Sequence, residues 1–355
     1  MEDLRRGLLR ANSEESIRRD PLRMLRAFRF ASILKFSVEP ETLGMIRRNR
    51  ELIKGVSAER IRTEVFAALG EDGAAGFLRQ LHRAGLLGEI FPELRGWENL
   101  AMGAESSLLD HALRTVEAAE FILSHLRALF PGQALLLKNH FSGTEEEGVA
   151  RAALFKFAAF LHDSGKAVVP PVGQGKLPAR YPDHDQAGEK INNAVARRMK
   201  LSRRSSRILS NLTRQHMRLS SLAKTGQVTV RAKFRFFQDM GREGLDLALL
   251  ALANSLAAGA FQFRLPPAPS LPGECGKIKE IAEELLRYYA EDFTRRPGRP
   301  LLDGTEVMKA LGIPGGKRVG LLLGKLREAE ISGQVRTREE ALEFLKTIPS
   351  SSDGE

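Results

Sequence analysis

The fold class is indicated by a stretch near the N-terminus that reads Asp20-Pro21-Leu22-Arg23-Met24-Leu25-Arg26-Ala27-Phe28-Arg29-Phe30-Ala31-Ser32-Ile33-Leu34. Its apolar residues recur at the spacing of one broad helix face, as Leu22, Leu25, Phe28, Ala31 and Ile33. Asp20 is a favourable N-cap, and Pro21 suits the first helical position. Similar periods recur along the chain, including one long helix expected over residues 229–258. The sequence therefore predicts an all-α fold.

Composition narrows the class of protein. Aromatic residues make up only 6% of the chain, which argues against a β-sandwich or barrel. The net charge of +11 points to a polyanionic partner, although a basic balance also aids solubility alone. Cys275 is the single cysteine, which excludes an internal disulfide and fits a reducing cytosol. No apolar run reaches the ~18 residues that span a bilayer. We expect a cytoplasmic protein that makes no membrane contact.

Four polar residues form a stripe opposite the apolar face of the first long helix. Asp20, Arg23, Arg26 and Arg29 recur every three residues, so their side chains are neighbours on a helix. Three guanidinium groups repel one another unless an anion lies among them, and a triphosphate is a suitable anion. The aspartate and the arginine beside it can imitate a Watson–Crick edge. The alternative is a solvated face with scattered salt bridges.

Three stretches of the chain, in order, resemble motifs of the class II tRNA nucleotidyltransferase (CCA-adding enzyme) and bacterial poly(A) polymerase family. They are Asp3–Arg10, Arg19–Ala31 and Val56–Glu64. The resemblance implies that Asp20 and Arg23 read the base of CTP or ATP. It also implies that Arg26 and Arg29 hold the nucleotide. The chain departs from the family at Arg19, where an acidic residue usually orients its neighbours, so base selection is expected to be loosened.

The resemblance also implies a domain organisation. We expect a helical neck/body domain over residues 1–100, an HD-type helical domain over 101–264, a Pro-rich linker over 265–272, a small helical tail domain over 273–346 and a disordered tail over 347–355. In the tail domain, the turn around Gly315 and Gly316 opens a helix. Such a turn either contacts a phosphate or is an ordinary joint between helices.

The family's polymerising chemistry uses a palm domain with a Gly-rich loop and a pair of carboxylates that bind Mg²⁺. The chain begins inside the motif that follows the palm, and no later Asp-x-Asp follows a strand-like segment. We therefore expect that these residues alone do not add nucleotides. The palm is then either supplied by a separate polypeptide or lost. The sequence does not distinguish a CCA, a single A or a poly(A) product, nor does it fix the oligomeric state.

A second pattern consists of four histidines and one aspartate, namely His111, His162, Asp163, His184 and His216. Neutral imidazoles and a carboxylate are suitable ligands for a divalent transition metal, and ligands from several helices can close a site inside a bundle. The pattern resembles the HD phosphohydrolase domain. That domain ends its metal set with an aspartate, which Asn254 replaces here. A neutral amide is a weaker ligand, so hydrolysis is in doubt.

Three hypotheses about function follow. The first is the RNA- and nucleotide-binding portion of a tRNA nucleotidyltransferase or poly(A) polymerase, acting on tRNA or other RNA 3′ ends with ATP or CTP. The second is a metal-dependent HD phosphohydrolase that acts on phosphate esters or nucleotides. The third is a catalytically silent RNA-binding remnant. Whether these residues form an enzyme by themselves therefore stays open at this stage.

Overall fold

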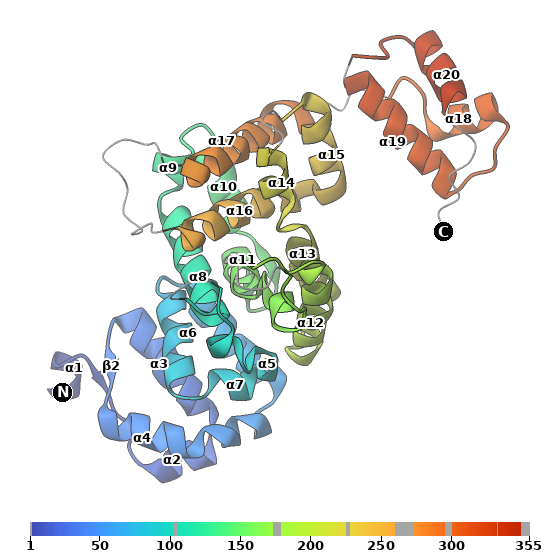
Figure 1. The fold of residues 1–355 in the computed structure, drawn as a ribbon. Coiled ribbons are helices and arrows are strands. Elements are labelled where there is room, and N and C mark those ends of the chain that lie inside the picture. The colour runs from blue at the N-terminus through green and yellow to red at the C-terminus, as the bar shows by residue number, and fades with distance from the viewer. Residues whose placement is uncertain are drawn as a thin grey trace. The chain divides into compact units, whose positions relative to one another are not determined.

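The computed structural model describes residues 2–102, 106–172, 179–224, 228–259, 271, 273–294, 300–331 and 333–348. Helices make up nearly all of the regular structure (Figure 1). The α-helices are α1 (Glu2–Arg5), α2 (Glu14–Arg19), α3 (Leu22–Leu34), α4 (Pro40–Asn49), α5 (Ala58–Gly70), α6 (Ala74–Arg83), α7 (Leu87–Ile90), α8 (Leu108–Ser124), α9 (Leu126–Leu129), α10 (Ala134–Phe141), α11 (Arg151–Leu161), α12 (His184–Arg198), α13 (Arg203–Gln215), α14 (Arg218–Lys224), α15 (Val230–Met240), α16 (Gly244–Ala258), α17 (Gly273–Tyr288), α18 (Gly304–Leu311), α19 (Lys317–Ile331) and α20 (Arg338–Thr347). The predicted all-α class is confirmed.

Two very short strand pairs complete the regular structure of the described residues. The strands β1 (Leu8–Leu9) and β2 (Ser37–Val38) run parallel, while β3 (Thr144–Glu146) and β4 (Val149–Ala150) run antiparallel. Short 3₁₀ turns include η1 (Arg50–Gly55), η4 (Ser164–Ala167) and η5 (Gly241–Glu243). No described helix is both long and apolar enough to cross a membrane.

The chain divides into two compact units. One comprises Met1–Ser221 and Leu245–Glu283, and the other comprises Leu222–Gly244 and Glu284–Glu355. The predicted domain boundaries stay predictions. Of the predicted linker over residues 265–272, only Leu271 is described. The predicted disordered tail lies outside the described residues beyond Ile348.

Helix α11 is the central element of the first unit. It packs against α5, α8 and α13, and Figure 1 shows it among these helices. Every residue of α11 except Ala152 is buried. The Phe157 ring meets Phe66 of α5 edge-on at 5.2 Å between centroids. A helix that is apolar on all sides must be enclosed by others, and this requirement places the body helices and the histidine-bearing helices around one core.

Two polar side chains on α11 are buried with partners. Arg151 forms ion pairs with Asp246 and Glu145, and His140 contacts the same Asp246 carboxylate at 2.7 Å. Lys156 donates to the Glu71 carbonyl at 2.7 Å, and burial lowers the pKa of its ammonium group. These contacts compensate for the cost of removing charges from water.

The single helix predicted over residues 229–258 is wrong. Helix α15 ends at Met240, and η5 separates it from α16. Gly241 adopts a φ of 53°, which a residue without a Cβ tolerates. Helical periodicity persists on both sides of this break, so the apolar pattern alone reads as one helix.

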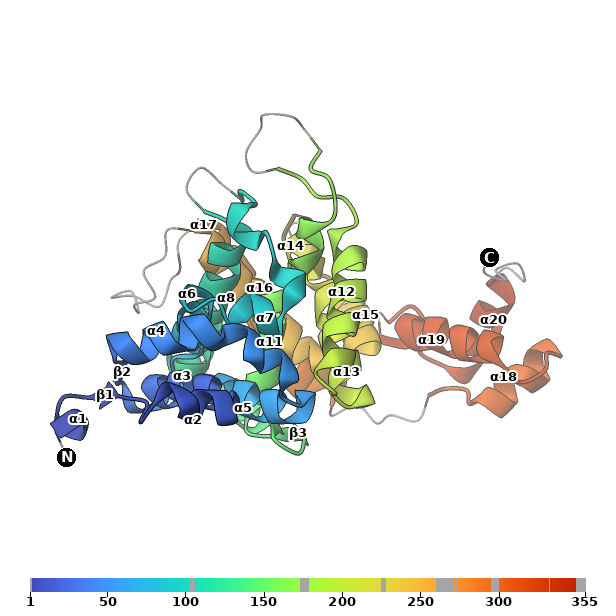
Figure 2. The same ribbon diagram turned by 90° about the horizontal axis from the view of Figure 1, so that it is seen from below.

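The second unit has a small core of its own. Its members come from α18, α19, α20 and the segments between them: Leu302, Val307, Val319, Leu322, Leu326, Ala329, Val335, Ala341 and Leu345. On α15, Arg231 and Arg235 both pair with the buried Glu328 of α19. Figure 2 shows α18, α19 and α20 packed together from a second direction.

Candidate functional site

The polar stripe of α3 meets helix α5, which follows it in the body. The apolar face of α3 is fully buried, with Leu25 0% and Phe28 2% exposed, so the opposite face carries the arginines. Glu64 of α5 lies beneath this face. Arg26 donates from Nε to one oxygen of Glu64 at 2.8 Å, and Arg29 donates from Nε to the other at 2.7 Å. One buried carboxylate thus holds two of the three arginines and reduces the repulsion between them.

Asp20 does not cap α3 as predicted. The residue at the cap position is Pro21, and no side chain caps the first turn. The Asp20 carboxylate instead accepts a hydrogen bond from Nη2 of Arg60 on α5 at 3.0 Å and lies 3.8 Å from Nη1 of Arg26. Two guanidinium groups attract the carboxylate more strongly than backbone N–H groups do. Its position is therefore set by α5.

Arg19 and Arg23 differ from the other arginines of this region. Arg19, which stands where the family usually has an acid, pairs with Glu15 at 3.1 Å within α2 and makes no contact with Asp20. Arg23 is exposed, and within the described residues its guanidinium makes no hydrogen bond or ion pair. Of the four predicted nucleotide-binding residues, Arg23 is thus the one whose donors are all available.

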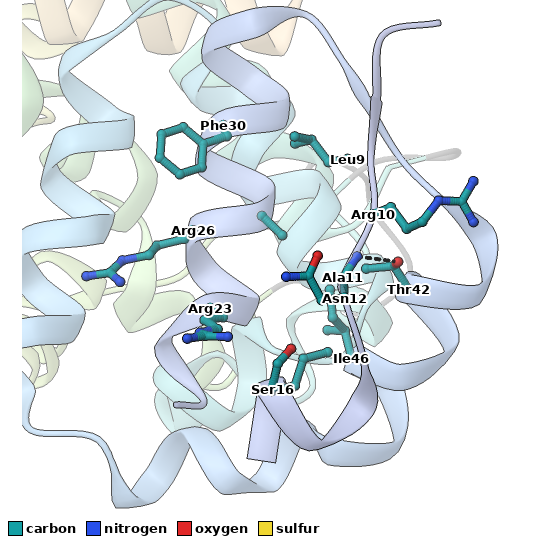
Figure 3. A pocket seen from close by; sticks show the side chains of 12 residues that line it. Leu9, Arg10, Ala11, Asn12, Ser16, Arg23, Arg26, Phe30, Thr42 and Ile46 are labelled. Carbon is teal, nitrogen blue, oxygen red and sulfur yellow. Dashed lines mark hydrogen bonds between the residues drawn. The ribbon is translucent and has the colours of Figure 1, made fainter. Parts of the chain in front are cut away.

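A cavity of about 340 Å³ opens beside Arg23 and Arg26. Figure 3 shows its lining, with Arg26 directed away from the N-terminal segment that forms the opposite wall. That segment is held in place because the Ala11 N–H donates to Oγ1 of Thr42 at 3.0 Å. The remaining lining residues are Leu9, Arg10, Asn12, Ser16, Ile17, Ala27, Phe30 and Ile46.

Sequence reasoning missed Glu64 and Arg60 as partners of the stripe, and it missed Asn12, Ser16 and Phe30 as cavity residues. A signal for the first pair was present. Arg60 and Glu64 are four residues apart, so they share one face of α5. Nothing local in the sequence marks Asn12 or Ser16, because only the packing of the N-terminal segment brings them to α3.

The second candidate site is the histidine cluster, and the structure brings all five predicted residues together. The Nε2 atoms of His111 and His162 lie 3.4 and 3.2 Å from Oδ2 of Asp163. Those of His184 and His216 lie 3.4 and 3.3 Å from Oδ1. The four rings come from α8, the end of α11, the start of α12 and the end of α13. All five residues are at most 9% exposed.

The backbone fixes the protonation of three of these rings. Nδ1 of His162 lies 2.8 Å from the Ala159 carbonyl oxygen, and the Nδ1 atoms of His184 and His216 have equivalent carbonyl partners at 2.6 and 2.7 Å. A carbonyl oxygen only accepts, so each Nδ1 carries a proton. Burial lowers the pKa of His162, which keeps that ring neutral. Its Nε2 then directs a lone pair at Asp163.

Lone pairs that face a carboxylate leave a position for a cation. Nε2 of His162 and Oδ1 of Asp163 are both buried and make no hydrogen bond within the described residues. Burial would raise the pKa of Asp163, but the His162 ring and the Lys166 ammonium 2.6 Å away hold it well below its usual range. The five residues include two groups of three that can hold a metal ion, and nitrogen and carboxylate donors suit a divalent transition metal.

Asn254, which sequence analysis assigned to the last ligand position, lies on α16 and is half-buried. Within the described residues it makes no hydrogen bond to the histidine cluster. The assignment of Asn254 to the metal set therefore stays a prediction.

Residues 35–97 match a protein family described as "Probable RNA and SrmB- binding site of polymerase A". This range contains α5, with Arg60 and Glu64, and ends before the histidine cluster. The match therefore concerns the helix that buttresses the arginine stripe.

Two bacterial relatives align with nearly the whole chain. An A-adding tRNA nucleotidyltransferase of Deinococcus radiodurans is 31% identical over 99% of the chain and 74% of its own length. A CC-adding tRNA nucleotidyltransferase of Geobacter sulfurreducens is 28% identical over 97% of the chain, which spans 66% of that protein.

Among solved structures, a Thermotoga maritima CCA-adding enzyme complexed with tRNA has a TM-score of 0.53 and 16% identity. The alignment covers 97% of the chain and 65% of that enzyme. At this identity the likeness concerns the fold. The chain thus spans about two thirds of the length of these proteins.

Proposed function

The chain belongs to the tRNA nucleotidyltransferase family, and we propose that it is the portion of such an enzyme that binds the incoming nucleotide and the 3′ end of tRNA. The observation that carries the proposal is the pairing of an immobilised carboxylate, Asp20, with an available guanidinium, Arg23. A carboxylate accepts from a base amino group, and a guanidinium donates to a ring nitrogen or carbonyl oxygen. Together they suit CTP or ATP.

In this proposal, Arg26 and Arg29 contribute positive charge for the triphosphate. Each engages Glu64 through Nε. The terminal nitrogens of Arg29 lie on the far side of that contact, where a phosphate oxygen can accept from them. Glu64 orients both guanidinium groups and does not itself meet the anion.

Nucleotide addition further requires a palm domain with two carboxylates and Mg²⁺, which would lie outside these 355 residues. A palm on a separate polypeptide has no support among the relatives. The relatives include both A-adding and CC-adding proteins, so the nucleotide added is left open. A cytoplasmic location stays a prediction from the single cysteine.

The test is a nucleotide titration followed by NMR or calorimetry. The chain alone is expected to bind ATP or CTP with a Kd on the order of millimolar, because an exposed helix face delivers only part of the about 1.5–3 kcal/mol of each charge-assisted hydrogen bond. Arg23→Ala should abolish this binding, while Arg127→Ala, at an exposed position on α9, should leave it unchanged. Equal affinities for all three proteins would refute the assignment of Arg23 as a base reader.

The histidine cluster favours a second function, that of a metal-dependent phosphohydrolase. In this proposal His111, His162, Asp163, His184 and His216 hold a divalent transition metal, and the convergence of Nε2 atoms on Asp163 supports it. A bound metal of this kind lowers the pKa of a coordinated water. Lys166, 2.6 Å from Asp163, adds a positive charge at the edge of the cluster that would attract a phosphate ester.

Metal analysis of the purified protein tests this second function. One equivalent of metal that is lost in His162→Ala but kept in His140→Ala would support it, because His140 is a buried histidine outside the cluster. A metal-free protein that takes up none on addition of Mn²⁺, Ni²⁺ or Zn²⁺ would refute it. A protein that binds tRNA but neither nucleotide nor metal would be the silent RNA-binding remnant.

A further inference from the structure

The positive charge of this protein is concentrated in one stretch. Residues 190–238 contain thirteen lysines and arginines and no aspartate or glutamate. Because the whole chain carries +11, all other residues together carry −2. Nine of the thirteen cations lie between Lys190 and Arg218, on α12, α13 and the start of α14, all within the first unit. The basic character of the protein is thus a property of these helices.

The densest part surrounds the turn that joins α12 to α13. Two of its six cations are neutralised, since Arg198 pairs with Glu93 and Arg204 pairs with Glu145. The other four are exposed, and within the described residues their side chains make no hydrogen bond or ion pair. We call these four residues the basic turn: Arg197, Lys200, Arg203 and Arg207.

The helix dipole makes half of this arrangement unfavourable in isolation. Arg203 and Arg207 lie in the first two turns of α13, where the N-terminus carries a partial positive charge, and the first turn contains no acidic residue. The two residues are four apart, so their charges also repel each other. An external anion would turn both terms from unfavourable to favourable.

Contacts beneath the surface hold the basic turn in one shape. Lys200 has a left-handed backbone with φ 52°, and Arg62 of α5 donates to its carbonyl oxygen. The Ser202 N–H donates to Glu146 at 2.9 Å, and the Ser202 hydroxyl caps α13 by accepting from the Ser205 N–H at 3.1 Å. The four cations are therefore presented by a fixed backbone, which reduces the entropy lost on binding.

We propose that the basic turn binds the sugar–phosphate backbone of a double-helical part of the tRNA. This inference rests on the proposed function and extends it to a surface on α12 and α13. Arginine forks match phosphate oxygens bidentately. No aromatic side chain occurs between Tyr181 and Phe234, so the surface lacks the stacking platform with which single-stranded bases are bound. Backbone contact to a duplex needs no such platform.

The test compares two double variants of the full chain in tRNA binding across a salt series. Arg203→Gln/Arg207→Gln removes two charges of the basic turn. Arg127→Gln/Lys138→Gln is the control, because it removes two exposed charges on α9 and α10 that also lack partners within the described residues. All four positions are exposed, so both variants should unfold at the wild-type temperature, which a thermal melt checks.

The basic-turn variant should lower the slope of log affinity against log salt by about 1.4–1.8, since each lost phosphate contact removes about 0.7–0.9. At 0.15 M salt this corresponds to an about 20-fold loss of affinity. The control should differ little from wild type. A blunt RNA duplex should show the same deficit, and single-stranded poly(A) should not.

Three results would overturn the inference: equal losses in the two variants, unchanged tRNA affinity in the basic-turn variant, or a deficit confined to poly(A). Unchanged affinity would leave an acidic protein surface as the partner of this turn. Absence of tRNA binding by the wild-type protein would instead overturn the proposed function itself, and the inference with it.

Discussion

Glu64 is the residue on which the geometry of the arginine stripe depends, and Glu64→Gln tests this dependence. The carboxylate accepts from Arg26 with one oxygen and from Arg29 with the other. A glutamine has one carbonyl oxygen and one NH₂ group, so one of the two arginines would face a donor. The substitution keeps the shape of the side chain and removes the charge.

The structure sets the size of the expected loss. Removing one partner from a fully buried ion pair costs about 3–5 kcal/mol. Here the Glu64 side chain is 8% exposed, but those of Arg26 and Arg29 are 42% and 20% exposed, so water recovers part of the cost. We expect a loss of about 2–3 kcal/mol in the free energy of unfolding, or about 5–10 °C in Tm for a unit of this size.

Glu15→Gln is the matched control, because Glu15 pairs with Arg19 at 3.1 Å while both side chains are more than half exposed. An exposed pair of this kind contributes little to stability. Chemical denaturation and thermal melts of the wild type and both variants measure the difference. Equal stabilities for Glu64→Gln and Glu15→Gln would refute the view that Glu64 organises the stripe.

Three further predictions concern other parts of the chain. If Asn254 occupies the last ligand position, Asn254→Asp should raise metal occupancy and the hydrolysis of a generic phosphodiester, and a wild type that already hydrolyses well would show that the amide is harmless. Arg48 at 2.8 Å and Asn49 lower the pKa of Glu14 to about 2 from its ordinary value of 4.5. The stabilisation from Glu14 is therefore complete above pH 4.5 and lost as the pH falls towards 2, so Glu14→Gln should flatten the stability profile across that window; parallel profiles would contradict this. Finally, these 355 residues alone should not extend a tRNA that lacks its 3′ end in the presence of Mg²⁺, CTP and ATP, and template-independent extension in a gel assay would disprove it.

Local patterns in the sequence were sufficient for the fold class and for the identity of the candidate residues. The period of Leu22, Leu25 and Phe28 reports a buried helix face, because the spacing of side chains on a helix is fixed by the backbone. The same rule placed Asp20 and three arginines on the opposite face. The order of four histidines and Asp163 was also sufficient to predict that they gather, and the structure brings them within hydrogen-bonding distance of one carboxylate.

Only the tertiary structure decided which charges meet and which stay available. Arg26 and Arg29 lie 38 and 35 residues from Glu64 in the sequence, and Asp20 lies 40 residues from Arg60. A local pattern contains no information on such partners, so it made Asp20 a helix cap and left Arg23 equivalent to its neighbours. Packing of α3 on α5 fixes these pairs because a buried carboxylate must find its donors inside the protein. The exposed cations that remain, Arg23 on α3 and the basic turn on α12 and α13, are those to which the fold itself supplies no anion.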